Sequence, residues 1–108
     1  MSQEAMDYRN ANQHFKTFCA TCHGLTGKGD GLAGLALDPR PRDWTDSEWQ
    51  DSVTDEEILK VIRDGGLAVD LSEGMAPNPE YRDNPGVLQQ LVKKVRGFRP
   101  KKDPKKEK

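Results

Sequence analysis

The chain has 108 residues, a length that fits one domain. The strong core-forming residues Leu, Ile, Val and Phe together number only 20, and mean hydropathy is -0.90. Charged residues make up 32%, but the net charge is -1, so self-repulsion does not force the chain open. No apolar run reaches the length of a transmembrane helix, which argues against a membrane protein. Either the chain is partly disordered, or something other than side chains fills its middle.

The first residues lack the basic and apolar stretches of a signal peptide, so the sequence shows no export signal.

The N-terminal segment predicts one long helix. From residue 3 to residue 18, apolar side chains recur at helical spacing. We expect them to form one buried face, made of Tyr8, Ala11, Phe15 and Phe18.

A Gly- and Pro-rich loop is expected over residues 24–43, followed by a short helix. Thr45 and Glu48 have the spacing of a capping box, which predicts that this helix begins after Thr45.

A second major helix is predicted from Thr54. Thr54 and Glu57 form a capping box, and Val53 and Ile58 stand at the positions of a hydrophobic staple. The pair at 65–66 is Gly-Gly, which is typical of a helix end.

The last helix is predicted between Asn84 and Gly97, with Asn84 as the cap and Pro85 at the first helical position. Its expected buried face is made of Val87, Leu88, Leu91, Val92 and Val95. The segment 67–83 reads as a second Gly- and Pro-rich loop, and no segment has a strand pattern.

The charges divide the chain into two parts. Residues 1–98 have 11 basic and 16 acidic side chains, whereas residues 99–108 have six basic and two acidic ones. The last ten residues contain two prolines and no large apolar side chain, a composition typical of disorder. We therefore expect a domain over 1–98 and a basic, solvated tail over 99–108.

The chemistry is concentrated in the run Cys19-Ala20-Thr21-Cys22-His23. C-x-x-C-H is the attachment signature of haem c. Two thiols one helical turn apart can add to the two vinyl groups of a porphyrin, and the adjacent imidazole then points at the iron. A cofactor of this kind would also supply the missing core.

Two other interpretations of these residues are weaker. A thioredoxin-like thiol pair requires a preceding strand, and here the approach is an amphipathic helix. A zinc site requires four ligands, and the only further histidine is His14. Gly29 to Gly34 matches the letters of a dinucleotide-binding fingerprint, but neither a strand nor a βαβ unit accompanies it. We expect these glycines to let a tight loop pass close to the cofactor.

Residues 3–98 resemble a class I c-type cytochrome of the small, soluble, bacterial, monohaem kind. The resemblance includes the attachment motif with Gly24, then segments in the family's order: 27–31, 39–44, 55–58, 75–77 and 91–96. It implies an all-α cytochrome c fold, in which three main helices and Gly/Pro-rich loops surround one haem c joined to Cys19 and Cys22.

The chain departs from the family's pattern at the crossing of the first and last helices. Ala11 stands where the family has Gly, and Lys94 stands where it has an aromatic residue. We expect a looser or differently packed crossing.

The resemblance also implies the iron ligands. His23 is the first, and the family's pattern points to Met75, in the loop before the last helix, as the second. His14 is the rival, but it lies on the attachment side, and we expect it to be a partly exposed flanking residue.

Other side chains are weaker candidates for binding the cofactor. Pro41, or else Pro39, could offer a backbone carbonyl to the Nδ1–H of His23. Arginine forks match carboxylates and an indole N–H donates, so four residues could bind the haem propionates. They are Arg40, Arg42, Trp44 and Trp49.

One haem iron with two protein ligands exchanges one electron and has no vacant position for a substrate. We therefore expect a monomeric, non-enzymatic electron carrier, periplasmic as the family implies, that docks transiently with redox proteins at the haem edge. The basic tail could reach an acidic partner or an anionic membrane surface, and we expect no nucleic-acid partner. The alternatives are a haem enzyme or gas sensor with a labile sixth ligand, and an electron-entry domain or subunit of a larger oxidoreductase.

Overall fold

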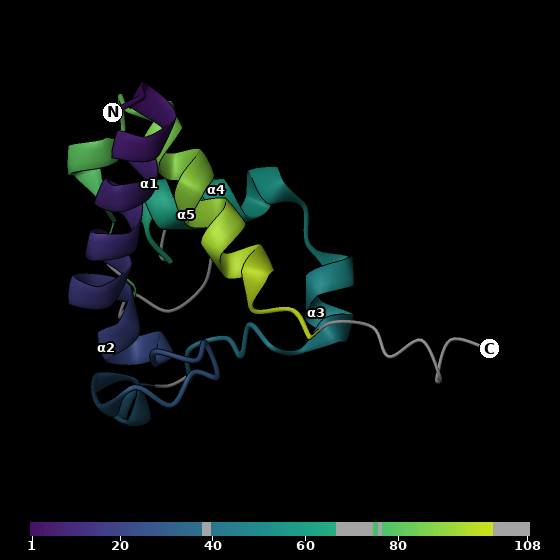
Figure 1. Ribbon diagram of the computed structural model, residues 1–108. Coiled ribbons are helices and arrows are strands. Elements are labelled where there is room, and N and C mark those ends of the chain that lie inside the picture. Colours follow the sequence, from purple (N-terminus) through teal and green to yellow (C-terminus); the bar gives the residue numbers. More distant parts are fainter. Residues whose placement is uncertain (38–39, 67–74, 76, 101–108) are drawn as a thin grey trace.

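The computed structural model describes residues 1–37, 40–66, 75 and 77–100, and in these ranges the chain forms helices and loops without strands (Figure 1). The elements in chain order are α1 (Gln3–His14), the π-helical turn η1 (Phe15–Cys19), α2 (Ala20–His23), the 3-10 turn η2 (Leu32–Ala36), α3 (Ser47–Ser52), α4 (Asp55–Asp64), the 3-10 turn η4 (Pro79–Tyr81) and α5 (Pro85–Gly97). The predicted all-α class is confirmed. Within the described ranges, no helix has the length and apolar character needed to cross a membrane.

α1, η1 and α2 follow one another directly and form the attachment helix, residues 3–23. The predicted buried face is half wrong, because Tyr8 is 58% and Phe18 59% exposed. The buried stripe is made of Asp7, Ala11, His14 and Phe15. A π-helical turn contains more residues than an α-helical one, so the face presented after Phe15 is rotated relative to the face before it.

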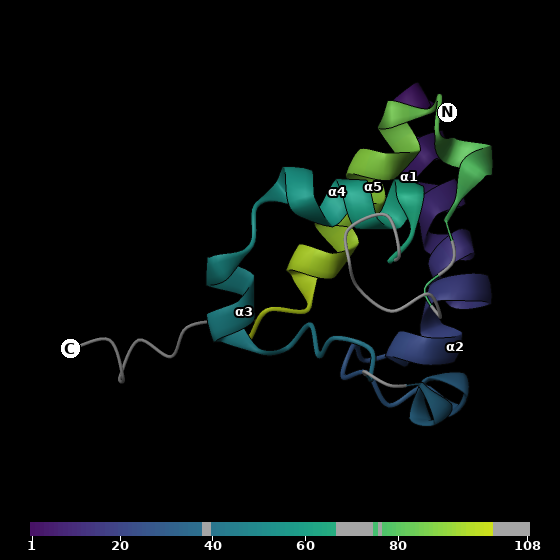
Figure 2. The same cartoon turned by 180° about the vertical axis from the view of Figure 1, so that it is seen from behind.

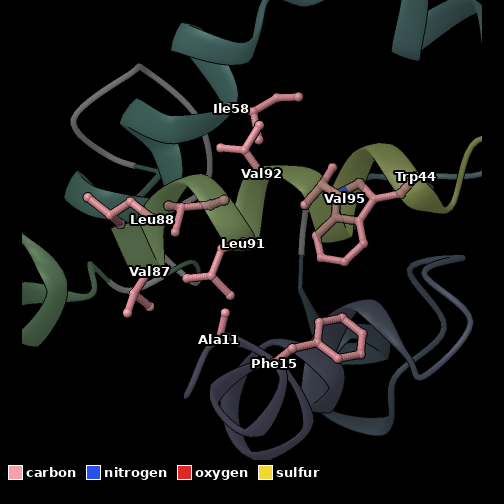
Figure 3. Packing of buried hydrophobic residues seen from close by; sticks show 10 residues of the cluster. Ala11, Phe15, Trp44, Ile58, Val87, Leu88, Leu91, Val92 and Val95 are labelled. Carbon is pink, nitrogen blue, oxygen red and sulfur yellow. The ribbon is translucent and has the colours of Figure 1, made fainter. Parts of the chain in front are cut away.

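α5 lies at the centre of the molecule and packs against both α1 and α4 (Figures 1 and 2). Its five predicted core residues are all buried, which confirms that face. Figure 3 shows them facing side chains from the attachment helix, from α4 and from the loop before α3. The buried cluster consists of Ala11, Phe15, Trp44, Ile58, Ile62, Val87, Leu88, Leu91, Val92 and Val95.

α3 begins after a different cap from the one predicted. The Asp46 carboxylate accepts from the backbone N–H groups of Glu48 and Trp49, and Asp46 is therefore the N-cap. Thr45 donates both its N–H and its hydroxyl to the Asp43 carboxylate. The prediction of a Thr45–Glu48 capping box is wrong, because an ionised carboxylate one residue later is the stronger acceptor.

The caps of α4 and α5 are as predicted. Thr54 and Glu57 form both hydrogen bonds of the capping box. Asn84 accepts from the N–H of Val87, with proline at the first helical position of α5. α4 ends at Gly65, whose φ of +86° is left-handed and suits glycine.

A hydrogen-bonded clamp joins α3 to the end of α5. Gln50 is 3% exposed and donates to the carbonyls of Trp44, at 2.8 Å, and Val95, at 2.9 Å. Arg96 donates to the Gln50 side-chain oxygen at 3.0 Å, to the Val53 carbonyl at 2.6 Å, and to the Asp55 carboxylate at 2.7 Å. The clamp fixes the position of the Trp44 backbone relative to α5.

Arg99 also contacts this part of the domain. Its guanidinium lies 2.9 Å from the Asp51 carboxylate, and its backbone N–H donates to Arg96. The sequence analysis places Arg99 in the solvated tail, whereas its side chain pairs with Asp51 of α3. Residues 101–108 lie outside the described residues.

The crossing of α1 and α5 is packed through a cation. The Lys94 ammonium lies 5.0 Å from the centre of the Phe15 ring and 5.9 Å from that of Phe98, and it donates to Asn12 at 3.0 Å. Ala11 is buried at the same crossing. A lysine whose charge lies over two rings thus occupies the place of the family's aromatic residue.

Candidate functional site

The two thiols lie one turn apart at the end of the attachment helix. Cys19 is the last residue of the π-helical turn and Cys22 lies in α2; both are free and half-buried. Burial raises the pKa of the Cys19 thiol to about 11, and the neighbouring Cys22 thiol contributes in the same direction.

His23 is buried beside them, with its ring held by the backbone of the following loop. Its Nδ1 lies 3.2 Å from the carbonyl oxygen of Arg42. A carbonyl can only accept, so Nδ1 holds the proton and Nε2 keeps a lone pair. Burial lowers the pKa of His23, and the bond to the Arg42 carbonyl opposes this in part. The imidazole is thus in the neutral tautomer that a metal ligand requires.

The carbonyl that orients His23 was predicted to belong to Pro41, or else to Pro39, and the structure corrects this to Arg42. The Pro41 carbonyl lies instead against Gly29, where an added Cβ would be 2.5 Å from it. Successive carbonyls of an extended chain point in different directions, so a shift of one residue changes which oxygen faces the ring. Pro39 lies outside the described residues.

Trp44 stacks on the His23 ring. The two ring centroids are 4.0 Å apart and the planes differ by 16°. The Trp44 backbone N–H donates to Gly27 at 2.7 Å, and the clamp holds its carbonyl through Gln50. Segment 42–44 therefore holds the His23 imidazole in two ways: the Arg42 carbonyl binds Nδ1 at the ring edge, and Trp44 stacks on the ring face.

The glycine-rich segment after the motif is tied to the attachment helix by its backbone. The N–H of Gly29 donates to the His23 carbonyl at 2.8 Å, and that of Gly31 to the Cys22 carbonyl at 3.0 Å. These donors are the ones that a phosphate would need. The rejection of a dinucleotide site is therefore supported by the hydrogen bonding.

The four candidate propionate ligands differ in exposure and in what they contact. Arg40 is exposed, and the guanidinium of exposed Arg42 lies over the Trp49 ring at 5.6 Å. Trp44 is buried among Phe15 and Phe98 as well as His23. A role of these four side chains toward propionates stays a prediction.

Met75 is half-buried and packs against the core cluster. Its carbonyl accepts from the Gly66 N–H at 2.9 Å, which joins it to the end of α4. The rest of the loop predicted around it, at 67–74 and at 76, lies outside the described residues.

His14 was expected to be partly exposed, and this is wrong. It is only 5% exposed, and its Nε2 lies 2.6 Å from Asn78 Oδ1. Phe18 and Tyr81 pack on its ring, with centroids at 4.7 and 4.9 Å. The sequence analysis did not identify Asn78; the available signal was His14 itself, which lies next to Phe15 on the predicted face of the attachment helix.

The donor set and its surroundings fit a large apolar cofactor. Two thiols and a neutral imidazole lie within the last five residues of the attachment helix. Leu25, Leu32 and Leu35 of the next segment are all at least half exposed, and such side chains give an apolar disc a surface to cover. Among the described residues, no three His, Cys, Asp or Glu side chains gather to hold a metal ion, so this part of the chain does not favour zinc. A helix rather than a strand precedes Cys19, which disfavours the thioredoxin-like alternative.

Comparisons with known proteins define the class. The family model described as cytochrome C oxidase, cbb3-type, subunit III matches residues 6–93. The solved structure of the KustC0563 c-type cytochrome has 32% sequence identity to the chain and a TM-score of 0.61. That match covers 82% of this chain and 95% of the other. No curated protein sequence matches the chain.

The fold and the attachment motif are those of a c-type cytochrome, as the sequence resemblance predicted. The chain belongs to the cytochrome c family of the cbb3-type subunit III kind, whose model spans most of its length. A protein of this family binds haem c covalently and transfers electrons through it. The prediction of haem c is thereby confirmed.

Proposed function

We propose that the chain is a one-electron carrier whose haem c is joined to Cys19 and Cys22 and ligated by His23 and Met75. When bound, haem c supplies a one-electron couple at its iron. With His23 and Met75 both bound to the iron, no position would remain for a substrate, and the haem would serve electron transfer to a docked partner. The observation that supports this most is His23, which is neutral and held at Nδ1 by the Arg42 carbonyl.

Residues of the chain itself fix the orientation of His23 and influence the redox potential of the site. The Arg42 carbonyl and the Trp44 ring hold the imidazole in one orientation, so little reorganisation accompanies a change of charge. A thioether at Met75 favours the reduced iron and raises the potential. The apolar cluster that Met75 packs against would limit access of water to the thioether, which acts in the same direction.

The test is an absorption spectrum of the purified protein in both redox states. We expect the bands of haem c, a low-spin iron, and the far-red band of methionine-to-iron ligation in the oxidised form. Carbon monoxide should not bind to the native reduced protein. Binding of carbon monoxide would contradict the closed site and favour a gas-binding or enzymatic function.

We propose a periplasmic setting for the carrier, with redox partners that dock transiently and without a nucleic-acid or stable self-association partner. The family's description names a subunit of an oxidase, and this favours a second candidate: an electron-entry subunit of a larger complex. A pull-down from the native source separates the two. A partner that stays bound at high salt would favour the subunit, and recovery of the monomer alone would favour the carrier.

A further inference from the structure

His14 is a buried polar side chain that the proposed electron transfer does not use. It lies in α1, one turn before Cys19, with its ring between Phe18 and Tyr81. Its Nε2 is 2.6 Å from Asn78 Oδ1, a contact between residues 64 apart in the sequence. A short hydrogen bond across such a separation joins two elements that the chain itself does not hold together.

The direction of this bond follows from the other partners of Asn78. The Asn78 side-chain N–H donates to the Ile62 carbonyl at 2.5 Å, and its backbone N–H donates to the Arg63 carbonyl at 3.2 Å. The amide nitrogen must face the Ile62 carbonyl, which can only accept, so Oδ1 faces His14 and the imidazole donates from Nε2. Asn78 thus joins the last turn of α4, whose carbonyls lack helical partners, to the attachment helix.

The residue three positions before Asn78 is Met75. Its carbonyl accepts from Gly66 at 2.9 Å, so one end of this short segment is held by the end of α4. The other end is held by α4 through Asn78 and by the attachment helix through His14. The Asp64 carboxylate adds a weaker contact to Arg82, at 3.5 Å. His14 therefore joins the segment that includes Met75 to the helix that includes both cysteines.

We propose that His14 is a positioning residue: its hydrogen bond to Asn78 latches the segment of Met75 to the attachment helix and sets how readily the Met75 thioether leaves the iron. The proposal rests on the proposed ligation by Met75. Without the Nε2–H donor, the partly buried Asn78 oxygen loses its partner, and opening of the segment costs less free energy. We therefore expect the loss of this bond to increase the population of the open state.

The test is an imidazole titration of the oxidised holoprotein, because imidazole takes the position that Met75 leaves. The covalent attachment keeps haem in every variant. We expect His14→Ala to raise the apparent imidazole affinity about tenfold, which corresponds to ~1.4 kcal/mol for one partly buried hydrogen bond, and to weaken the far-red methionine band. His14→Gln places an amide N–H near the position of Nε2 and should restore the wild-type affinity.

Asn12→Ala is the matched control, because Asn12 lies on the same helix and loses a comparable hydrogen bond, to Lys94, away from the Met75 segment. It should leave imidazole affinity unchanged. Equal increases in Asn12→Ala and His14→Ala would reduce His14 to a general stabiliser of the fold and overturn the proposal. Failure of His14→Gln to restore the affinity would also contradict it.

A double-mutant cycle on denaturant unfolding separates the latch from the ligation. The losses in His14→Ala and Asn78→Ala should not add in the double variant, because both remove the same bond. Additive losses would overturn the latch even if the wild type has the far-red band. Absence of that band from the wild type would instead overturn ligation by Met75, and with it any effect of His14 on the thioether, whatever the cycle gives.

Discussion

Most of the buried apolar side chains come from α1, α4 and α5, where helices pack directly on one another. The segment after the attachment motif is stabilised differently. The N–H groups of Gly29 and Gly31 bond to carbonyls of the attachment helix. The side chains of Leu25, Leu32 and Leu35 are exposed. The helical side has a core of its own, and the motif side has backbone hydrogen bonds and apolar surface that a cofactor can cover. Folding and cofactor binding are therefore expected to be coupled most strongly on the motif side.

Removal of the attachment site should produce the largest effect. In Cys19→Ala/Cys22→Ala, haem c cannot be joined, and the helical core alone is too small to offset the conformational entropy of the chain. We expect loss of cooperative thermal unfolding, measured by circular dichroism against the wild-type holoprotein. A sharp transition in the variant would mean that the helical side folds by itself.

Met75→Ala tests whether Met75, which packs against the helical core, is the second iron ligand beside His23 of the motif side. Haem should stay attached, and the potential should fall by on the order of 0.1 V as the thioether is lost. Potentiometry and the far-red band are the measurements. A variant that keeps both the wild-type band and the wild-type potential would exclude Met75 as the ligand.

Gln50→Ala tests the clamp that joins the Trp44 segment to α5. Two buried carbonyls, those of Trp44 and Val95, lose their donor. The free energy of unfolding should fall by about 2 kcal/mol. Gln89→Ala, on the exposed side of α5, is the control and should change it by less than about 0.5 kcal/mol. Equal effects would mean that the clamp contributes nothing specific.

Gly65→Ala tests the junction between α4 and Met75. Gly65 has a left-handed φ, and an added Cβ would lie 3.0 Å from the Met75 carbonyl oxygen. We expect a loss of about 1–2 kcal/mol in unfolding free energy. Gly97→Ala meets no atom within 4 Å and should be neutral or slightly stabilising. An unchanged unfolding free energy in Gly65→Ala would show that the backbone at this junction adjusts to a Cβ without loss of stability.

Truncation of the basic tail should have the smallest effect on the fold. Residues 101–108 include five lysines against one aspartate and one glutamate. Their removal should leave the melting temperature and haem spectrum unchanged, while low-salt electron-transfer rates with an acidic partner fall and high-salt rates do not. Rates that match at every ionic strength would make the tail a solvated end. Truncation from Arg99 should add a small loss of stability, because Arg99 pairs with Asp51.

Local signals in the sequence predicted the helices and their ends well. The capping box at Thr54 and the Asn84–Pro85 start depend on residues three apart or fewer, so tertiary structure does not change them. The cap of α3 was misassigned because both Thr45 and Asp46 are residue types that commonly cap helices. Which of them accepts the first helical N–H groups depends on their other hydrogen bonds, and the Thr45 hydroxyl is bonded to Asp43.

The candidate site was predictable where one short motif defines it. C-x-x-C-H identified the thiols and His23 because their chemistry depends on spacing alone. The Arg42 carbonyl was missed by one residue, since it depends on the path of a loop. His14 was expected to be partly exposed because its partner, Asn78, is 64 residues away and no local pattern reports that distance.

The π-helical turn at Phe15–Cys19 has a consequence for how such motifs are recognised. One additional residue in a helix turns everything beyond it by about 100° around the axis. This turn therefore sets the angle between the buried stripe of α1 and the thiols of Cys19 and Cys22. Deletion of a single residue here would leave C-x-x-C-H intact to any search by pattern, yet point both sulfurs at a different side of the protein. The C-x-x-C-H signature defines only the spacing of its residues. The direction in which the two sulfurs point relative to the core depends on the four residues before Cys19.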